Sequence, residues 1–439
     1  MKNKLFLKAG SKPAFRGLNT GGRMTILEIA KKIENAGGKL YIVGGAVRNK
    51  ILGKEIKDED YCVTGITKEE FIKIFPEANF RGKSFEVFVL ENKEFAMART
   101  EEKTGIGHKD FMVNTNKNIT IEEDLKRRDI TINAIAQDVL TGKIIDPYHG
   151  TKDLKEKRIK AVSKAFAEDP LRVYRVARIS AELEFEVEKN TLKMMNSLKD
   201  ELLSLSKERV FEELRKALKT NKPSIFFEVL KNADVLEVHF KEIYDLIGAE
   251  QPEKYHPEGD SYNHTMIALN NCAKITKDEK IRFACLVHDL GKGRTPKEMY
   301  PHHYGHEERG IEPLRELSKR LGLPNEWKEC GMTSIKEHMK GAIFHKMTIP
   351  KQVSFLERVE KSKLGLDGLQ KVVYSDRARH EEENIENQEY NFVNLGKKML
   401  QEIDGKYIKE KYNIEPGKEF GQKLHEERIK WLKNKCCLQ

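Results

Sequence analysis

Two acids and a glycine pair near the N-terminus have the residue types and spacing that nucleotide chemistry requires. The apolar run Leu40–Val43 leads into Gly44–Gly45, and Asp58 and Asp60 follow a short distance later. In a strand, alternate residues share a face, so Asp58 and Asp60 would point one way and Glu59 the other. Two such carboxylates can hold two Mg²⁺ ions, which stabilise the attacking and leaving oxygens when a hydroxyl displaces pyrophosphate from a nucleotide.

The glycine pair offers a place for the triphosphate of that nucleotide. Leu40–Val43 predicts a strand that ends at Gly44, where bare backbone N–H groups and the guanidinium of Arg48 can meet phosphate oxygens. A second strand, from Asp58 to Thr64, is expected beside the first. A glycine pair after a strand is usually a turn, and an Asp-x-Asp is usually a solvated strand end. The prediction of a nucleotide site therefore depends on the order and spacing of the glycine pair and the two aspartates, and not on either motif alone.

A second segment places cations before an acid and an amide. Arg127 and Arg128 precede Asp129 and Asn133. If this segment is helical, Asp129 and Asn133 share a face, so that Asn133 can bind a sugar hydroxyl or phosphate and Arg128 the triphosphate. Taken alone, the segment fits a capped helix with a basic start better.

A third segment carries an arginine series at helical spacing. Arg172, Arg175 and Arg178 fall on one helix face, and apolar residues between them place this face beside packed surface. Pro170 suits a helix start, where Asp169 and Arg172 would offer acceptors and donors to the pairing edge of a base. The basic helices expected near 207–219 and 423–435 are further candidates for phosphate contact.

The C-terminal half contains a series of histidines with two acids. Imidazole and carboxylate groups together suit a divalent transition metal, which lowers the pKa of a bound water and so makes it a nucleophile. A single His-Asp pair would more often be structural. The series consists of His264, His288, Asp289, His302, His303, His306, His338 and Asp376.

Two kinds of periodicity predict the elements that position these residues. Strand and helix patterns mix from Lys39 to about Pro147, with a hairpin over Ser84–Arg99 and a loop over 101–118, whereas amphipathic helices dominate after Gly150. We therefore expect an α+β fold, in which a head with a small mixed sheet precedes an all-α neck and body and an all-α tail.

Composition narrows the class of protein. The chain has 439 residues, of which 34% are charged, and a formal charge of +10, which fits a polyanionic partner. No stretch approaches the roughly 20 apolar residues that span a membrane. The six cysteines have no paired metal-ligand spacing, which favours reduced thiols and a cytoplasmic location.

Four motifs follow one another along the chain: the glycine pair with Arg48, the acid pair, the segment from Arg127 to Asn133, and Asp169 with Arg172. In this order they resemble the class II tRNA nucleotidyltransferase and bacterial poly(A) polymerase family. The resemblance runs from about residue 38 to the C-terminus. It implies that Asp58 and Asp60 are catalytic and bind Mg²⁺, and that Asp169 and Arg172 select the incoming base. The residues that it implies for nucleotide binding are Gly45, Arg48, Arg128, Asp129, Asn133, Asp169, Arg172, Arg175 and Arg178.

The C-terminal half resembles the HD-superfamily metal phosphohydrolases. His264, His288, Asp289 and Asp376 match the core ligands of that pattern, which implies a divalent transition metal such as Ni²⁺ or Mn²⁺. Head and tail together look like the long bacterial CCA-adding enzymes. That likeness implies 2′,3′-cyclic phosphodiesterase, 2′-nucleotidase and phosphatase activities, which would repair RNA 3′ ends.

Turn-forming or charged residues interrupt the periodicity near 147–150, 251–260 and 381–389, which predicts domain boundaries there. We expect an N-terminal leader and short helix at 1–37, a nucleotidyltransferase head at 38–150 and a helical neck and body at 151–250. An HD domain at 251–385 and a helical tail at 386–439 complete the expected order.

The expected reaction is CCA addition to the 3′ end of tRNA from CTP and ATP, without a nucleic-acid template, by a monomer or homodimer. A poly(A) polymerase would share the head motifs, although that branch has a Gly-Arg-Arg-Phe type segment where this chain has Gly82-Lys83-Ser84-Phe85. An A-adding enzyme that works with a separate CC-adding partner is compatible with the same head. A function of a different class is an HD phosphohydrolase whose head only binds RNA, but the presence of both Asp58 and Asp60 argues against it.

Overall fold

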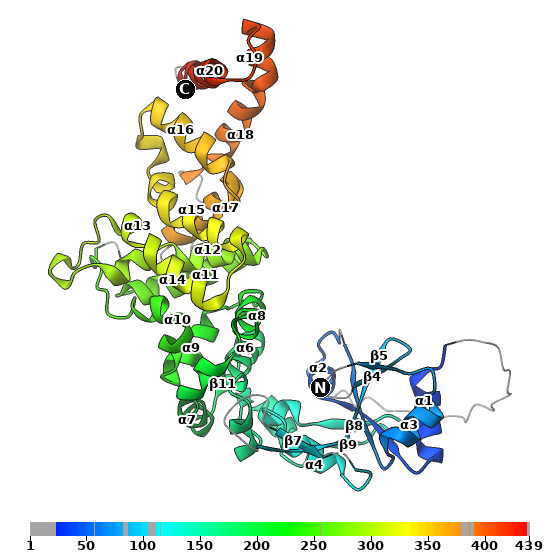
Figure 1. Ribbon diagram of the computed structural model, residues 1–439. Coiled ribbons are helices and arrows are strands. Elements are labelled where there is room, and N and C mark those ends of the chain that lie inside the picture. Colours follow the sequence, from blue (N-terminus) through cyan, green and yellow to red (C-terminus); the bar gives the residue numbers. More distant parts are fainter. Residues whose placement is uncertain are drawn as a thin grey trace, which may run out of the picture.

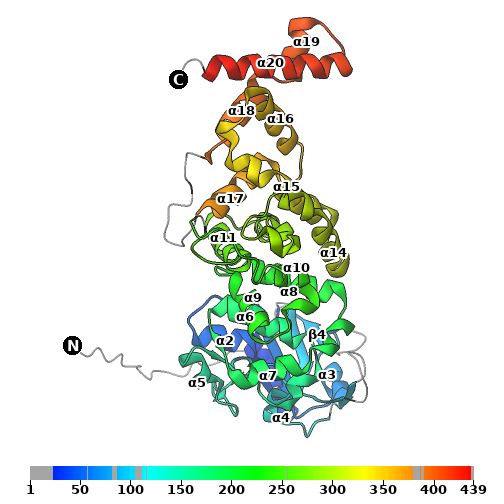
Figure 2. The same ribbon diagram turned by 90° about the vertical axis from the view of Figure 1, so that its left-hand side faces the viewer.

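The protein consists of a mixed α/β head beside a long column of helices, seen in a computed structural model (Figure 1). The structure describes residues 23–56, 58–81, 87–103, 111–114, 116–254, 256–378, 386 and 390–436. The head lies beside one end of the column, and the C-terminal helices form the other end (Figure 2). The predicted α+β fold, with its small mixed sheet and helical remainder, is confirmed.

The head is built on one seven-stranded sheet. Its strand order is β3-β4-β5-β2-β1-β8-β9, in which β2 pairs antiparallel with β1 and parallel with β5. The hairpin predicted over 84–99 is confirmed for β4 and β5. The bounds are β1 Lys39–Val43, β2 Asp60–Thr64, β3 Asn79–Arg81, β4 Val87–Leu90, β5 Lys93–Met97, β8 Ala136–Asp138 and β9 Ile144–Ile145.

Strand β2 begins two residues later than the sequence predicts. Its register with β1 runs from Lys39 opposite Thr64 to Val43 opposite Asp60. Because β1 ends at Val43 and the chain turns at Gly44, Asp58 has no residue of β1 to pair with. The prediction that β2 starts at Asp58 is therefore wrong, while its position beside β1 is confirmed.

The two faces of β2 belong to different cores. Tyr61 and Val63 pack with Phe71 in the core under α1 Ile26–Asn35 and α3 Lys68–Ile74. Cys62 packs into the core on the opposite face, with Ala134. By strand alternation Asp60 lies on the Cys62 side, which is the side of the neck.

Two local predictions in the head are wrong. The chain at 129–133 is not an α-helix, because α4 Ile121–Lys126 ends before it and only the 3₁₀ turn Thr131–Asn133 follows. The predicted loop over 101–118 contains two paired strands, β6 Thr100–Lys103 and β7 Phe111–Asn114. The leader 1–22, the segment 82–86 and residues 437–439 lie outside the described residues.

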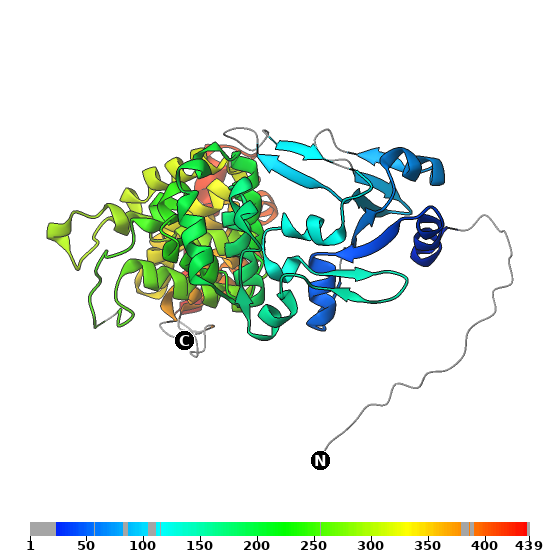
Figure 3. The same cartoon turned by 90° about the horizontal axis from the view of Figure 1, so that it is seen from below.

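Head and neck share one hydrophobic core. Val47 on α2 Gly45–Ile51 and Ile132 pack in the same cluster as Val173 and Val176 on α6 Arg172–Leu183. The view from below shows the sheet side by side with the helical column (Figure 3). The arginine series of α6 is thereby held against the head.

The rest of the chain is helical, except that β10 Arg158–Ile159 and β11 Glu186–Val187 pair as a small parallel sheet in the neck, which the sequence pattern predicts to be all-α. Helices α11, α12, α15 and α17 pack on one another, and Cys272 and Cys285 lie in their core. No helix among the described residues is long and apolar enough to cross a membrane. The principal helices are α7 Lys189–Ser197, α8 Lys207–Leu218, α9 Ser224–Asn232, α10 Leu236–Tyr244, α11 Ser261–Ile275, α12 Glu279–Val287, α13 His306–Arg309, α14 Ile311–Leu321, α15 Asn325–Ala342, α16 Ile349–Glu360, α17 Gly365–Arg377, α18 Val393–Glu402, α19 Gly405–Tyr412 and α20 Lys418–Cys436.

A buried histidine makes the neck sensitive to acid. Nδ1 of His239 lies 2.6 Å from the hydroxyl of Tyr174, and burial, together with the charge of Arg320, lowers the pKa of His239 to about 4. The unfolded chain, with a pKa near 6.5, binds more protons between these values, so stability falls as pH drops through that window. We expect a loss of about 2 kcal/mol between pH 7.5 and pH 5.

Urea unfolding of the wild type and His239→Gln at both pH values checks this expectation. The variant should lose about 2 kcal/mol less than the wild type on acidification, because glutamine does not titrate. Equal losses in the two proteins would contradict the assignment of this acid sensitivity to His239.

Candidate active sites

A cavity of about 560 Å³ lies between the head and the neck, and we call it the head cavity. Four places in the chain contribute to its walls: the Gly44–Gly45 turn after β1, the start of β2, the segment after α4, and the start of α6. The sequence-predicted residues that line it are Gly45, Asp60, Arg128, Asp129, Asn133, Asp169, Arg172 and Arg175.

The two acids predicted to be catalytic are exposed and uncommitted. The side chain of neither Asp58 nor Asp60 makes a hydrogen bond or ion pair with the part of the chain that the structure describes. Glu59 is engaged on the other side, where it accepts from the hydroxyl of Tyr61 and pairs with Lys93 at 3.3 Å. Asp60 lines the head cavity, whereas Asp58 precedes the strand and is not among the lining residues. Free carboxylate oxygens are the donor type that Mg²⁺ takes, so the acids fit this ion.

The turn at Gly44 brings the backbone close to the guanidinium group of Arg128. Gly44 has a φ of +72°, and a Cβ atom there would lie 3.1 Å from Nη1 of Arg128. The positive φ favours glycine, and a Cβ atom would push the Arg128 guanidinium away by a few tenths of an ångström. The turn thus leaves the Arg128 guanidinium directly over the start of α2.

Replacing Gly44 by Ala should therefore impair nucleotide addition. Strain and displacement of Arg128 should together lower kcat/KM about tenfold or more. Gly53→Ala is the matched control, because Gly53 has a φ of +66° but nothing within 4 Å of a Cβ. It should lose a similar amount of stability and keep its activity. Equal activity of the two variants would contradict the role of the turn.

A buried carboxylate that sequence reasoning missed positions two arginines. Asp124 is 1% exposed, and its oxygens accept from Arg127 at 2.8 Å and from Arg128 at 3.2 Å. Burial alone would raise the pKa of Asp124, but the two guanidinium groups lower it below its usual value. The available signal was an acid placed three and four residues before the arginine pair.

Asp129 holds a third arginine at the cavity. It accepts two hydrogen bonds from Arg175, at 3.0 and 2.9 Å, and one from Asn133 at 3.3 Å. Burial would raise the pKa of Asp129, but Arg175 and Arg172 lower it to about 2. Asp129 is therefore ionised at neutral pH, and its charge keeps Arg175 in place.

Two predicted phosphate ligands lie behind the cavity instead of in it. Arg48 is buried and donates to Asn133 at 2.9 Å and to Glu182 at 3.1 Å. Arg178 donates to Glu182 and to Glu213, each at 2.7 Å. These contacts join α2 in the head to α6 and α8 in the neck, and neither arginine lines the head cavity.

The pair predicted to select the base lies at the start of α6. Asp169 accepts from the backbone N–H of Leu171 at 3.0 Å and from Arg209 on α8 at 3.1 Å. Arg172 donates to the backbone carbonyl of Arg127 at 2.7 Å. Arg99, Arg127 and Arg209 also line the cavity and were not predicted individually. Arg209 does belong to the basic helix that the sequence suggested for phosphate contact.

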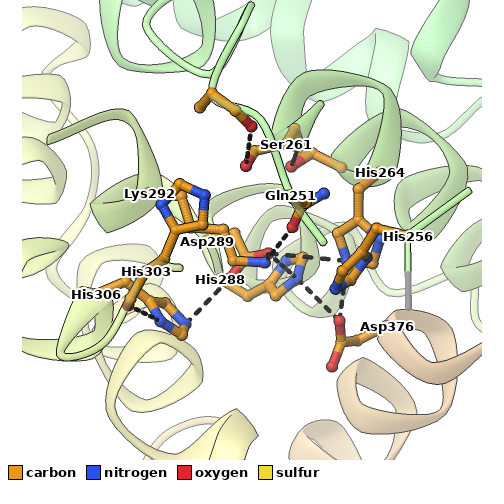
Figure 4. A network of polar contacts seen from close by, with 12 residues as sticks. Gln251, His256, Ser261, His264, His288, Asp289, Lys292, His303, His306 and Asp376 are labelled. Atoms are coloured by element: carbon orange, nitrogen blue, oxygen red, sulfur yellow. Dashed lines mark hydrogen bonds and ion pairs between the residues drawn. The ribbon is translucent and has the colours of Figure 1, made fainter. Parts of the chain in front are cut away.

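The four predicted metal ligands of the tail come together from three helical elements (Figure 4). His264 lies on α11, His288 and Asp289 follow α12, and Asp376 lies near the end of α17. We call these residues the first cluster. One ligand atom from each lies within 4.8 Å of all the others. Nε2 of His264 is 2.9 Å from Oδ1 of Asp376, and Nε2 of His288 is 3.2 Å from Oδ2 of Asp289.

Neighbouring acceptors orient the imidazole rings. Nδ1 of His288 lies 2.6 Å from the carbonyl of Cys285, and Nδ1 of His264 lies 2.8 Å from Oε1 of Glu258. Each Nδ1–H therefore donates outward, and each Nε2 faces the acids. Glu258 was not predicted to act here, although it lies just before the helix that carries His264. Such an outer carboxylate commonly orients a metal-binding histidine.

The charges of the first cluster fit a cation. Burial alone would raise the pKa values of Asp289 and Asp376. His288 and Lys292 hold the pKa of Asp289 well below its usual value, and contacts with His264 and His288 do the same for Asp376. Within the described residues, Nε2 of His288 and both oxygens of Asp289 are buried and lack a hydrogen-bond partner. Two ionised acids beside two imidazole nitrogens are the donor set of a divalent transition metal.

A second cavity, of about 590 Å³, opens over the first cluster, and we call it the tail cavity. Lys292 and Arg377 line it with positive charge. Tyr304 lies at its rim, 74% exposed, with its ring stacked on His302 at a centroid distance of 5.4 Å. Cations beside an exposed aromatic ring suit a phosphate attached to a nucleoside.

Comparisons with known proteins agree with this division into two sites. A family model described as the poly A polymerase head domain matches residues 40–160. A model described as a probable RNA and SrmB-binding site of polymerase A matches residues 184–246, and the HD domain model matches residues 261–362. The chain thus combines a polymerase-type nucleotidyltransferase head with an HD domain.

Two curated relatives make the assignment more specific. The multifunctional CCA protein of Shewanella denitrificans is 46% identical over 309 residues, which cover 68% of this chain and 74% of that protein. The multifunctional CCA protein of Mannheimia succiniciproducens is 44% identical over 310 residues, covering 68% and 73%. The chain belongs to the multifunctional CCA protein family.

Solved structures share the fold. A CCA-adding enzyme in complex with ATP has a TM-score of 0.63 at 21% identity, covering 92% of this chain and 88% of that one. The Thermotoga maritima CCA-adding enzyme complexed with tRNA has a TM-score of 0.60 at 20% identity, covering 92% and 90%. At these identities the comparison concerns the fold alone.

Proposed function

We propose that this protein adds cytidine, cytidine and adenosine to the 3′ end of tRNA, using CTP and ATP and releasing pyrophosphate. The observation that carries the proposal is the head cavity, which joins Asp60, the Gly44 turn and Arg128 to the start of α6. Membership of the multifunctional CCA protein family supports the same reaction. The net charge of +10 supports a tRNA partner.

In this proposal, Asp58 and Asp60 hold Mg²⁺ in the head. When bound, Mg²⁺ supplies stabilisation of the charge that develops on the attacking and leaving oxygens. Arg128 and Arg175, held by Asp124 and Asp129, neutralise the triphosphate. Because both arginines are fixed by acids before the nucleotide arrives, little side-chain ordering remains to be done on binding.

Asp169 and Arg172 would choose the base by hydrogen-bond polarity. Cytosine and adenine both present an amino group that a carboxylate accepts from, beside a ring nitrogen that a guanidinium donates to. Uracil and guanine present a carbonyl oxygen in place of that amino group, which would face the carboxylate of Asp169 without a proton. The pair therefore supports CTP and ATP and excludes UTP and GTP.

Extension of a truncated tRNA tests the proposal. A tRNA transcript that lacks its three terminal residues is incubated with the purified protein and resolved at single-nucleotide length. CTP alone should add two residues, and CTP with ATP should add three and then stop. Long A tails from ATP alone would instead assign the chain to the poly(A) polymerases.

We also propose that the tail hydrolyses phosphate esters at RNA 3′ ends, as a 2′,3′-cyclic phosphodiesterase, 2′-nucleotidase and phosphatase. The first cluster under the tail cavity supports this activity. A bound Ni²⁺ or Mn²⁺ would supply a water of lowered pKa. Lys292 and Arg377 would bind the phosphate, and Tyr304 would stack on the base. A cytoplasmic monomer or homodimer is the form that we propose for the enzyme.

A further inference from the structure

We propose that Arg209 is a positioning residue that helps to set which nucleobase the head cavity accepts. It acts through Asp169, whose carboxylate it holds in the orientation that suits an amino group. This role deepens the proposed CCA addition, and it rests on that function. The favoured substrates are nucleoside triphosphates whose base carries an amino group beside an acceptor ring nitrogen, and the excluded ones carry a carbonyl beside a ring N–H.

The carboxylate of Asp169 is held at both of its oxygens. Oδ1 accepts from the backbone N–H of Leu171 at 3.0 Å, inside the turn that begins α6. Oδ2 accepts from Nη2 of Arg209 on α8 at 3.1 Å. A hydrogen bond to each oxygen restricts rotation about the Cβ–Cγ bond, because the carboxylate cannot turn without breaking one of the two. Asp169 and Arg209 both line the head cavity, so the remaining lone pairs of the carboxylate can face a base.

Arg172, the donor of the base-selecting pair, is held in a different way. Its side chain is buried, and its guanidinium donates to the backbone carbonyls of Ala165 and Arg127. These carbonyls belong to the turn before α6 and to the segment after α4. The donor of the pair is therefore fixed by backbone groups, whereas the acceptor is fixed in part by a side chain that comes from α8.

Helix α8 is a firm support for Arg209. Val210 and Leu214 on α8 are fully buried in the core that α6 also enters, and the two helices lie side by side in the column (Figure 1). Glu213 on α8 accepts from Arg178 on α6 at 2.7 Å. The backbone that carries Arg209 is therefore fixed relative to the start of α6, where Asp169 lies.

A fixed carboxylate excludes uracil, whereas a mobile one does not. Cytosine offers an amino group as donor and N3 as acceptor, and uracil reverses both, with O4 as acceptor and N3–H as donor. If the carboxylate of Asp169 can turn, it can accept from N3–H of uracil, and UTP then finds a partner in the cavity. With the carboxylate fixed toward the amino group, uracil leaves polar groups unpaired, which is the strongest basis for rejecting a substrate.

The ion pair between Arg209 and Asp169 is too exposed to matter much for folding. The two side chains are 30% and 26% exposed, and a pair of this kind contributes little to stability. Removal of Arg209 should therefore change base selection and leave the neck folded. This combination distinguishes a positioning residue from a merely structural one.

Addition of the first nucleotide to a truncated tRNA tests the inference. The full-length chain is given a transcript that lacks its three terminal residues, and kcat/KM is measured separately for CTP and for UTP. Arg209→Gln should lower the CTP-to-UTP ratio of kcat/KM about tenfold or more, because a charged hydrogen bond that orients the carboxylate is lost. Arg209→Lys keeps the charge and should keep more of the ratio. Arg158→Gln is the matched control: Arg158 pairs with Glu156 in the neck at 3.2 Å and does not line the head cavity, so the ratio should stay at the wild-type value.

A double-mutant cycle shows whether Arg209 acts through Asp169. Asp169→Asn alone should lower the same ratio, and adding Arg209→Gln to it should lower the ratio no further. Additive losses would overturn the inference. So would equal losses of kcat/KM for CTP and UTP in Arg209→Gln, because these would indicate that Arg209 contacts the triphosphate or the RNA.

The remaining outcomes separate this inference from the proposed function. An unchanged CTP-to-UTP ratio in Arg209→Gln would overturn the inference and leave CCA addition intact. Loss of the fold in this variant, seen by circular dichroism, would also overturn it, because Arg209 would then have a structural role. A wild-type chain that adds no CMP to the truncated tRNA would overturn the proposed function, and the inference with it.

Discussion

Replacing Asp60 by Asn should stop nucleotide addition while hydrolysis by the tail continues. The substitution keeps the shape of the side chain and removes the charge that would hold Mg²⁺ at the head cavity. Metal stabilisation of the transferred phosphoryl group is worth several kcal/mol, so we expect a loss of about 10³-fold or more in the rate of CMP addition. The rate is measured with truncated tRNA, and hydrolysis with a 2′,3′-cyclic nucleotide.

Glu59→Gln is the matched control for Asp60→Asn. Glu59 is the neighbouring acid, but it contacts Tyr61 and Lys93 on the other face of the strand. Its replacement should leave CMP addition within about twofold of the wild type, since a partly exposed ion pair is worth little. If Asp60→Asn kept the wild-type rate, or if Glu59→Gln were equally damaging, the assignment of the catalytic acid would be wrong.

Replacing His288 by Gln should have the opposite effect. His288 is buried, and its Nε2 faces Asp289 and Asp376 at 3.2 and 3.4 Å. Loss of this residue should lower hydrolysis of a 2′,3′-cyclic nucleotide by about 10³-fold, because the first cluster would lose one of the ligands that would hold its metal. CMP addition to tRNA should be unchanged, because no residue lines both the head cavity and the tail cavity.

His345→Gln controls for the general effect of removing a histidine from the tail. His345 is exposed. Among the described residues its Nε2 lies 2.9 Å from the carbonyl of Asn391 and its ring packs on Phe344, and it touches neither site, so both activities should persist. A folded His288→Gln protein that lost both activities would contradict the separation of the two sites. Full hydrolysis by this variant would remove the first cluster from the reaction.

Short-range regularities explain what the sequence predicted well. Strand alternation separates Glu59 from Asp60 correctly, because side chains on neighbouring positions of a strand must point to opposite faces. The apolar residues at helical spacing before residue 37 likewise predict the short helix that the structure shows as α1. The local order of Gly44, Asp60 and Arg128 was enough to predict that these residues meet, and the structure places all three at the head cavity.

What the sequence did not predict depends on packing between distant segments. The start of β2 follows from where β1 ends, which the residues around Asp58 do not encode. The spacing of Arg172, Arg175 and Arg178 gives a helix face, but only the docking of α6 turns Arg178 toward Glu213 and away from the cavity. Arg48 also does not line the head cavity, because the docking of α6 places Glu182 where it forms an ion pair with Arg48 at 3.1 Å.

The tail shows the same limit. The histidines were visible as a series, yet nothing in their spacing separates His306, which faces Oδ1 of Asp289, from His303, which hydrogen-bonds Thr295 and the carbonyl of Glu250. Only the packing of α11, α12, α15 and α17 shows which histidines lie near the acids. This packing brings residues that are far apart in the chain to within a few ångströms of one another.

A crystal structure with CTP and Mg²⁺ tests the central claim, that the head cavity is where the nucleotide reacts. The triphosphate should lie between Asp60 and Arg128, with Mg²⁺ on Asp58 and Asp60, and the cytosine edge should meet Asp169 and Arg172. CTP bound elsewhere, or bound in the cavity with Mg²⁺ on neither acid, would contradict the account.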